Sequence, residues 1–443
     1  MAMLSSVRAD RLIVSNRKTF HSTKTFPALL LLSVFHLRLL AVDGLRVTRP
    51  RRRSHCSTLR SWACQAEVKA FDNNQVISND KFVAKNLEED NELISTRAWL
   101  EHLPNGAYTV VRCDISPRMK RSVDGLNSQR AWRIFGQPFH IERLKSSYKT
   151  FAKAKQLPVI EAELDTAEKV SKLLLHFLLR EAETEFSNVQ VNDVQDDKQR
   201  EIYTIMVTLL WHNSSEVVEK ICVKGHACSV GKSVDPSATY PQAVKAAIAT
   251  RSYLPHESSF LDSQNDDILP SRQPAPEAKL SSWCTERRSL EMEFLKRGDS
   301  CVNDIILCQT NTGSSGLPSL KLLEGLTSNL FVRLEGGVLM TADVERDGVL
   351  GGYARDMVIQ QAQKMDLTVR LTAPVLEESH FWKEVFLTSS IKLIVPVDQV
   401  NVPSIDEDGS ACFRTVWSLS QEQRNNSDQE PALWLQLYQS LLF

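Results

Sequence analysis

The stretch Leu323-Glu-Gly-Leu-Thr-Ser-Asn-Leu-Phe331 decides the fold that we predict for this chain of 443 residues. It places one acidic residue, Glu324, between the apolar pair Leu322-Leu323 and Gly325, shortly before a run that is typical of a strand. Burying a carboxylate in such surroundings is costly unless a cation or a hydrogen-bond donor faces it. Glu324 is therefore either a turn-exposed glutamate, the commoner case for this residue type, or a buried acid with a role.

A glycine-led helix start follows downstream, in Leu350-Gly-Gly-Tyr-Ala354. The apolar period predicts a helix over Gly352 to Leu367. The first amides of a helix have no intrahelical acceptor and lie at its positive end, so those of Tyr353 and Ala354 could bind an anion. Glycine before a helix is also common for purely structural reasons.

Hydroxyl groups and one cation complete the pattern. Phe386-Leu-Thr-Ser-Ser390 ends a predicted strand with Ser389 and Ser390, and Arg143 lies in His140-Ile-Glu-Arg-Leu144. A lone arginine on a helix is usually solvated. Together, however, a carboxylate, a helix N-terminus, hydroxyls and a cation are suited to bind a phosphorylated ring that carries a nitrogen atom, and that ring would be pyridoxal phosphate.

In this order the motifs resemble the class IV pyridoxal-phosphate enzymes, which include branched-chain aminotransferase, D-amino-acid aminotransferase and aminodeoxychorismate lyase. The resemblance covers about Gly106 to about Pro403 and is strongest after Asp304. Ala278-Lys-Leu-Ser-Ser-Trp283 is most similar to plant members described as D-amino-acid-aminotransferase-like. The resemblance implies an α+β fold with a small α+β domain, a larger barrel-like β domain with flanking helices, and a homodimer.

The same resemblance implies a role for individual residues. Lys279 takes the place of the Schiff-base lysine, with Lys296 as a weaker competitor, and Glu324 the place of the acid that binds the pyridine nitrogen. The phosphate would be bound by Arg143, the amides of Tyr353 and Ala354, and the hydroxyls of Ser389 and Ser390. A freed Lys279 amine would also move the proton between the substrate α-carbon and the cofactor carbon.

Two departures from the family pattern concern the site. Gly351 replaces the usual proline before the helix, so the turn is less rigid. The tyrosine that often follows the lysine is missing, and Trp283 and Cys284 stand nearby instead. The second departure leaves the reaction type open.

Composition and charge restrict the possible classes. A net charge of -1, without a cluster of Lys and Arg in the body of the chain, argues against a nucleic-acid partner. The nine cysteines and ten histidines lack metal-site spacing, so no metal is expected. The apolar run from Phe26 to Val42 is too short for a span, and we expect no stable membrane span in the mature protein.

We predict three regions along the chain. Residues 1–66 are acid-poor and rich in Arg and Ser, as a transit peptide is, which would be disordered or cleaved. This predicts a plastid protein, with the mitochondrion as the alternative; a secretory signal or an anchor are further readings. Residues 67–226 would form the small domain and 227–443 the large cofactor-binding domain, with a mobile insertion at about 255–276.

Local patterns predict most of the regular elements. The expected strands are 106–112, 133–139, 201–211, 217–223, 304–308, 330–334, 337–341, 385–387 and 393–397; the expected helices are 140–155, 166–183, 352–367 and 431–443, and residues 310–318 are expected to form a turn. The predicted function is an aminotransferase that acts on a small amino acid and a 2-oxo acid. A lyase of the aminodeoxychorismate type and a non-catalytic relative are the alternatives.

Overall fold

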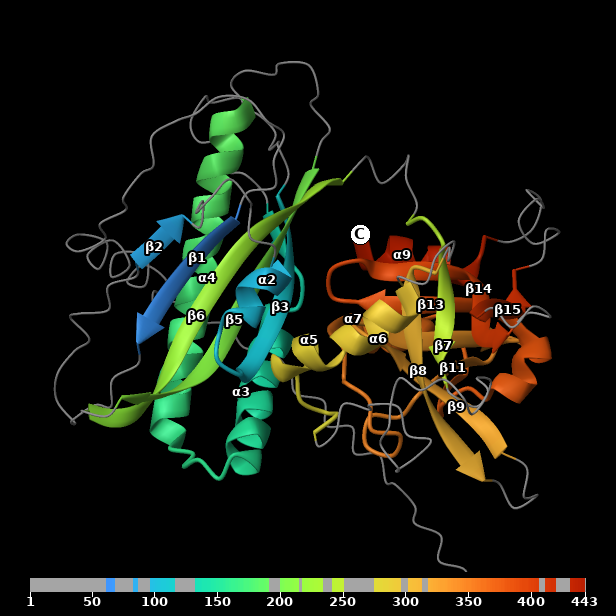
Figure 1. Cartoon of the computed structure of the whole chain (residues 1–443). Coiled ribbons are helices and arrows are strands. Elements are labelled where there is room, and N and C mark those ends of the chain that lie inside the picture. The colour runs from blue at the N-terminus through green and yellow to red at the C-terminus, as the bar shows by residue number, and fades with distance from the viewer. Residues whose placement is uncertain are drawn as a thin grey trace, which may run out of the picture. The chain divides into compact units, whose positions relative to one another are not determined.

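The structure is a computed structural model, and it describes residues 61–67, 83–86, 96–115, 132–190, 200–214, 217–233, 241–250, 275–295, 302–312, 318–405, 411–419 and 431–442. All of these belong to the unit Arg46–Phe443. The predicted leader up to residue 60, and the predicted insertion apart from Ala275 and Pro276, lie outside the described residues. The fold is α+β and contains two sheets (Figure 1).

The first sheet is antiparallel, with strand order β2-β1-β6-β5-β3-β4. Its strands are β1 Ser61–Glu67, β2 Val83–Asn86, β3 Gly106–Ile115, β4 Trp132–Ile134, β5 Arg200–Ser214 and β6 Val217–Ser233. The β-branched residues of β3 and β5 favour this extended pairing. β1 lies in part within the predicted leader and β6 continues past the predicted boundary at 226; the domain boundaries stay predictions.

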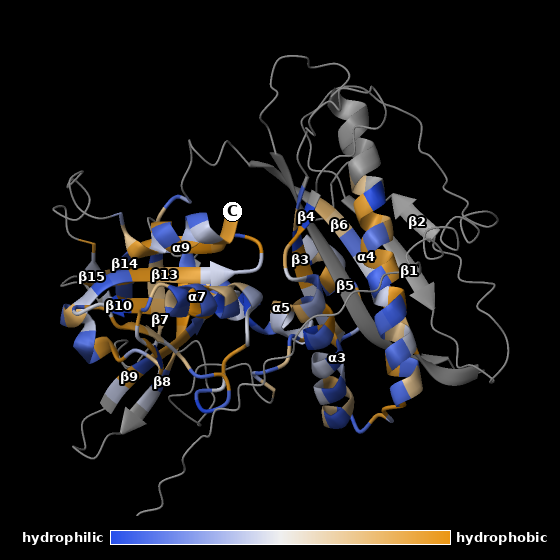
Figure 2. Ribbon diagram, turned by 180° about the vertical axis from the view of Figure 1, so that it is seen from behind, coloured by the Kyte–Doolittle hydropathy of each residue, from blue (hydrophilic) through white to orange (hydrophobic). Residues whose placement is uncertain are grey.

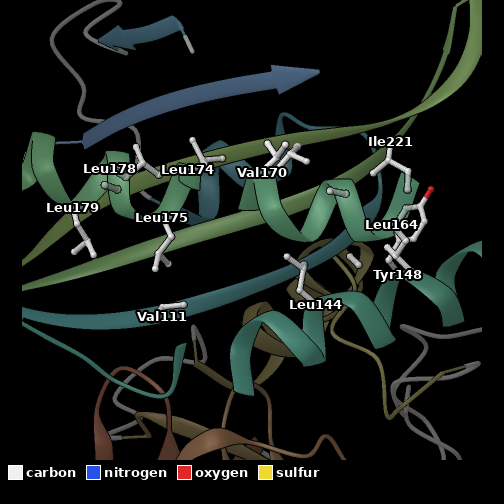
Figure 3. Close-up of a cluster of buried hydrophobic side chains, with 14 of the residues drawn as sticks. Val111, Leu144, Tyr148, Leu164, Val170, Leu174, Leu175, Leu178, Leu179 and Ile221 are labelled. Atoms are coloured by element: carbon white, nitrogen blue, oxygen red, sulfur yellow. The ribbon is translucent and has the colours of Figure 1, made fainter. Parts of the chain in front are cut away.

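Helices α2 (Thr96–Glu101), α3 (Gln137–Ala154) and α4 (Glu161–Gln190) accompany this sheet. Along α4 hydrophobic and hydrophilic residues alternate with the helical period (Figure 2). Its apolar residues Val170, Leu174 and Leu178 are buried in one cluster with Ile221 of β6 (Figure 3). Gly225 of β6 permits this close packing, because a Cβ there would lie 2.8 Å from the side chains of Leu174 and Leu178.

The second sheet closes on itself. The strands β10-β13-β14-β7-β8-β9 follow one another, and β9 pairs back to β10 through Asn329 opposite Glu324. Their bounds are β7 Val244–Ala249, β8 Asp304–Thr312, β9 Pro318–Gly325, β10 Asn329–Leu334, β13 Trp382–Ser389 and β14 Leu393–Ile405, with β11 Leu339–Thr341, β12 Val369–Leu371 and β15 Ala411–Ser418 added at the edges. This confirms the barrel-like β domain.

Buried side chains pack on both faces of this closed sheet, and five helices of the described residues accompany it. The helices are α5 Ser282–Glu286, α6 Arg288–Leu295, the 3-10 helix η1 Leu376–Phe381, α7 Tyr353–Lys364 and α9 Leu433–Leu442. One buried cluster takes side chains from each of the six closing strands. On the other face, Phe331 of β10 and Phe386 of β13 stack with centroids 5.2 Å apart and pack with Val358 of α7 and Leu437 of α9.

Three sequence predictions were wrong in part. The strand expected over 133–139 ends at Ile134, because Gly136 turns the chain with a φ of 63° and α3 starts at Gln137. The turn expected over 310–318 is strand up to Thr312 and again from Pro318, and the residues between them lie outside the description. The strand expected over 217–223 continues to Ser233 as β6.

We expect the carboxylate of Glu384 to make a measurable contribution to the stability of the fold. It accepts hydrogen bonds from the amides of Leu433 and Trp434, both at 3.1 Å, and from Arg333 at 2.6 Å, so it attaches α9 to β13. Glu384→Gln should lower the free energy of unfolding by about 2 kcal/mol, because it removes a charged acceptor from three donors. Denaturant unfolding measures this.

The matched control is Glu335→Ala. Glu335 pairs with Lys383 at 2.8 Å, but both side chains are about half exposed. Exposed ion pairs contribute little, so this variant should change stability by less than about 0.5 kcal/mol. Equal losses in the two variants would show that Glu384 does not hold α9 in the way described.

Candidate active site

The site begins at Glu324, at the point where the sheet closes. In the pairing of β8 with β9, Ile306 lies opposite Gly325 and Cys308 lies opposite Leu322. An advance of two residues along β8 therefore matches three residues along β9, so β9 carries a bulge between Leu322 and Gly325. Strict alternation from Leu322 would point Glu324 to the same side as that leucine. The bulge instead puts Glu324 beside Asn329, on the face that carries Phe331 and is covered by α7.

Glu324 is buried, with 2% of its surface exposed, and donors surround it. Its Oε2 accepts a hydrogen bond from the Leu350 amide at 3.2 Å and from Asn329 Nδ2 at 3.3 Å. The buried Arg355 guanidinium lies within electrostatic reach of Glu324; burial lowers the Arg355 pKa, and the carboxylates of Asp356, Asp343 and Glu324 oppose that effect. The reading of Glu324 as a turn-exposed glutamate is thus wrong.

Asn329 fixes the carboxylate relative to the start of α7. Its Nδ2 also donates to the Leu350 carbonyl at 2.7 Å. Its Oδ1 lies 2.2 Å from the place where a Cβ of residue 352 would stand, so only glycine fits there. A single amide side chain therefore holds the acid and the turn from Leu350 to Gly352 at a constant spacing.

The start of α7 has the geometry expected for an anion site. Gly352 is its extended N-cap residue, with φ of -91° and ψ of 141°. The amides of Tyr353 and Ala354 are the first of the helix, where no intrahelical acceptor exists. A Cβ on Gly351 would meet no atom closer than 3.9 Å, so the loss of the proline found in the family is not forced by crowding.

Arg143 of α3 reaches the same turn. Its guanidinium donates to the Gly351 carbonyl at 3.3 Å and to Thr109 Oγ1 at 3.1 Å, and it lies 5.3 Å from the Phe139 ring centroid. The helix N-terminus and a full positive charge therefore meet at one turn. Both favour a bound anion.

His140 lies beside Arg143 and is completely buried. Its Nδ1 is 3.0 Å from Thr109 Oγ1 and 3.2 Å from the Arg143 guanidinium. Burial lowers the pKa of His140 well below its usual value, and the charges of Arg143 and Lys279 lower it further. The imidazole is therefore neutral at neutral pH, and it lies within electrostatic reach of both cations.

Lys279 is held by its backbone against the first sheet. Its amide donates to Ser147 Oγ at 3.0 Å, and its carbonyl accepts from the Tyr108 amide at 3.0 Å. Leu280 forms a bridge with Ala107, which extends the pairing to β3. The Lys279 side chain is half-buried, and its Nζ lies 4.9 Å from the centroid of the Tyr108 ring.

Tyr108 and Cys284 occupy the surroundings of the lysine where the family tyrosine is missing. The Tyr108 hydroxyl lies 3.9 Å from Cys284 Sγ, and both residues are buried. Trp283 donates through Nε1 to the Leu326 carbonyl at 2.8 Å, so it is a packing residue. The aromatic ring near the Lys279 amine is thus that of Tyr108 in β3, and not that of a tyrosine in α5.

Ser389 is the last residue of β13, and Ser390 follows it. Ser389 Oγ accepts a hydrogen bond from the Lys392 amide at 3.2 Å. Arg112, paired with Asp114 at 2.7 Å, donates to the Ile391 carbonyl at 2.7 Å and so ties β3 to this turn. The phosphate role of the two serines stays a prediction.

The structure thus joins Glu324, the start of α7 and Arg143 through direct contacts, and Lys279 shares an electrostatic neighbourhood with Arg143 at His140. Lys296 lies outside the described residues. Sequence reasoning assigned no role to Asn329, His140 or Tyr108. All three stand inside motifs that carry the family resemblance, and this was the available signal.

These residues fit pyridoxal phosphate. The group needs an amine, an acid for its ring nitrogen and an anion site, and the buried acid of Glu324 is held by Asn329 to the same turn that starts α7. Buried polar atoms without a partner among the described residues, His140 Nε2 and Thr388 Oγ1, leave donors for a ligand. No metal-binding cluster was found within the described ranges.

Comparisons with known proteins gave similar structures but no similar sequences. No family model and no curated protein matches the chain. Among solved structures, the branched-chain aminotransferase of Thermoproteus uzoniensis shares 17% identity, covering 82% of this chain and 91% of the other with a TM-score of 0.45. A fold IV-transaminase of Curtobacterium pusillum shares 17% identity, with coverage of 86% and 99% and a TM-score of 0.46.

A hypothetical aminotransferase from Mycobacterium tuberculosis, in its PLP-bound form, shares 13% identity, with coverage of 81% and 95% and a TM-score of 0.44. The contacts inside this chain, and not these similarities, support the function proposed below. In the part of the chain that the structure describes, no helix has the length and the apolar character needed to cross a membrane.

Proposed function

We propose that this protein is a pyridoxal-phosphate-dependent aminotransferase that acts on a small amino acid and a 2-oxo acid. The observation that carries the proposal is the buried Glu324 carboxylate, which Asn329 fixes to the turn from which α7 starts. That turn also meets Arg143. An acid held at a fixed distance from an anion site matches a ring that contains a basic nitrogen and carries a phosphate on a side arm.

When bound, the cofactor would supply an aldehyde and a protonated ring that withdraws electrons from the substrate α-carbon. Glu324 keeps the proton on the ring nitrogen, because its negative charge favours the protonated form. Arg143 and the amides of Tyr353 and Ala354 would hold the phosphate. Lys279 would bind the aldehyde group, and its freed amine would move the proton at the α-carbon.

The surroundings of Lys279 suit this role. Its amine must be neutral to attack a carbonyl or accept a proton. The nearby charge of Arg143 disfavours a second ammonium, whereas the Tyr108 ring 4.9 Å away favours it. His140 is neutral because of its burial. Arg143 and Lys279 thus share a neighbourhood to which His140 adds no further charge.

A lyase of the aminodeoxychorismate type is the second candidate. The observation that favours it is the buried pair Trp283 and Cys284 where the aminotransferases of the family often have a tyrosine. With that hydroxyl missing, the fate of the substrate after proton removal is less tightly directed toward transamination. Both candidates use the same acid, amine and anion site.

An amino-donor experiment separates the candidates. Purified protein loaded with pyridoxal phosphate and given an amino donor alone should convert the cofactor to its amine form, because a transaminase completes this half-reaction without acceptor. Absorption spectroscopy and product analysis measure it. In a parallel sample given aminodeoxychorismate instead, release of pyruvate with the aldehyde retained would identify the lyase. No spectral response to any donor and no pyruvate from aminodeoxychorismate would identify a non-catalytic relative.

The cellular setting and assembly are part of the proposal. The acid-poor leader supports import into a plastid, with the mitochondrion as the alternative, and the family resemblance supports a homodimer. Imaging of a fluorescent fusion to residues 1–66 tests the first point. Light scattering of the purified protein tests the second, and a monomeric mass would overturn it.

A further inference from the structure

Three polar side chains form a row across three neighbouring strands. Asn329 of β10 lies directly opposite Glu324 of β9 on one side and Thr388 of β13 on the other. Directly opposed residues of antiparallel strands project to the same face of a sheet. Thr388 therefore shares a face with the Glu324 carboxylate, whereas its neighbour Ser389 projects to the opposite face.

That face is the one covered by α7. The next residues along it, Phe331 and Phe386, pack with Val358 of α7, and Ile394, which lies opposite Thr388, belongs to the same cluster. The row also lies at the beginning of α7, because Asn329 Oδ1 abuts the Cβ position of Gly352, the N-cap residue. Thr388 thus lies on the face that α7 covers, in the same row as Asn329.

Among the described residues, none forms a hydrogen bond with the Thr388 hydroxyl. Only 1% of the residue is exposed. A buried hydroxyl without a partner costs free energy. Thr341 of β11 shows the ordinary solution, since it is equally buried and its Oγ1 donates to the Leu330 carbonyl at 2.7 Å.

We infer that the Thr388 hydroxyl is a ligand-binding group that donates to the phosphate of the cofactor at the start of α7. This rests on the proposed function and adds to it a residue outside the predicted set. Sheet parity makes Thr388, and not Ser389, the hydroxyl of this strand that shares a face with the Glu324 carboxylate. The acid, the amide of Asn329 and the hydroxyl would then contact one ligand from adjacent strands.

The test uses Thr388→Val, which removes the hydroxyl and keeps the shape. In the cofactor-free protein the melting temperature should stay the same or rise, because a buried hydroxyl without a partner disappears. Affinity for pyridoxal phosphate should fall about 10- to 100-fold, the usual loss for a hydrogen bond to a charged group. Inorganic phosphate should raise the melting temperature of the wild type and do so much less in the variant.

Two further variants control this result. Thr341→Val should lower the melting temperature and leave the phosphate response intact, because the hydrogen bond that it breaks is internal and involves none of the groups proposed to bind the phosphate. Thr388→Ser should keep the phosphate response, because it retains the hydroxyl. If Thr388→Val lowers the melting temperature as Thr341→Val does and still responds fully to phosphate, the hydroxyl is structural and the inference is wrong.

Ligand probes separate this inference from the proposed function. Pyridoxal, which lacks the phosphate, should bind Thr388→Val and wild type equally; weaker binding would assign the hydroxyl to the ring and overturn the phosphate role. A wild type that responds to inorganic phosphate but gives no absorption band with pyridoxal phosphate would contradict the Lys279 proposal alone. A wild type that does not respond to phosphate would overturn the Thr388 inference, whatever the band shows.

Discussion

Lys279→Ala is expected to remove the visible absorption band of bound pyridoxal phosphate and to lower the rate of the amino-donor half-reaction by at least about 10³-fold, because one residue supplies both the covalent attachment and the proton transfer. The backbone contacts of residue 279 with Ser147 and Tyr108 do not depend on its side chain. The variant should therefore fold. Absorption spectra and single-turnover kinetics measure the effect.

The control for this prediction is Lys364→Ala. Lys364 is an exposed lysine in the last turn of α7, so its removal should change neither the band nor the rate. If the band survives in Lys279→Ala, another amine holds the cofactor. Lys296→Ala would then be the next variant, since Lys296 is the competing lysine of the sequence.

Glu324→Gln should give the second largest effect. The amide keeps the size of the side chain and can still accept from the Leu350 amide, but it carries no charge to keep the ring nitrogen protonated. The half-reaction should slow by about 10²- to 10³-fold, a typical cost for one preorganised electrostatic contact. Stopped-flow rates measure this, and the pH dependence of the bound cofactor spectrum should shift at the same time.

Glu384→Gln is the matched control, because Glu384 is also a buried glutamate of the second sheet, at the far end of β13 from Ser389. It should lower stability without changing the cofactor spectrum. A Glu324→Gln variant that keeps the wild-type rate would show that this acid does not face the ring nitrogen. If the rate of Glu324→Gln falls only because the variant is less stable, the same conclusion follows.

Sequence patterns predicted the elements whose signal is local. The β-branched run of β3, the amphipathic α7 and the apolar start of β8 were confirmed, because a period of two or of 3.6 residues reflects burial on one face. The glycine that starts α7 was also visible in the sequence. The strand predicted through Phe139 was wrong, because the left-handed conformation of Gly136 ends the strand and α3 begins at the next residue.

The candidate site could be predicted only as separate residues. Motif resemblance identified Glu324 and Arg143, which the structure joins through the Leu350 to Gly352 turn. It assigned no role to Asn329, because that residue matters through its two simultaneous hydrogen bonds, one to Glu324 and one to the Leu350 carbonyl. Thr388 was missed for a related reason, because its importance depends on a strand that lies opposite it.

By itself, the sequence determined the periods that form the surrounding strands and helices, and it predicted the acid, the amine and the helix start. Only the tertiary structure decided which way these groups face. The bulge in β9 turns Glu324 to the α7 side, and the pairing of β10 with both β9 and β13 aligns it with Asn329 and Thr388. Local backbone geometry fixes a period, whereas the face and the neighbours of a side chain depend on hydrogen bonds between segments far apart in the chain.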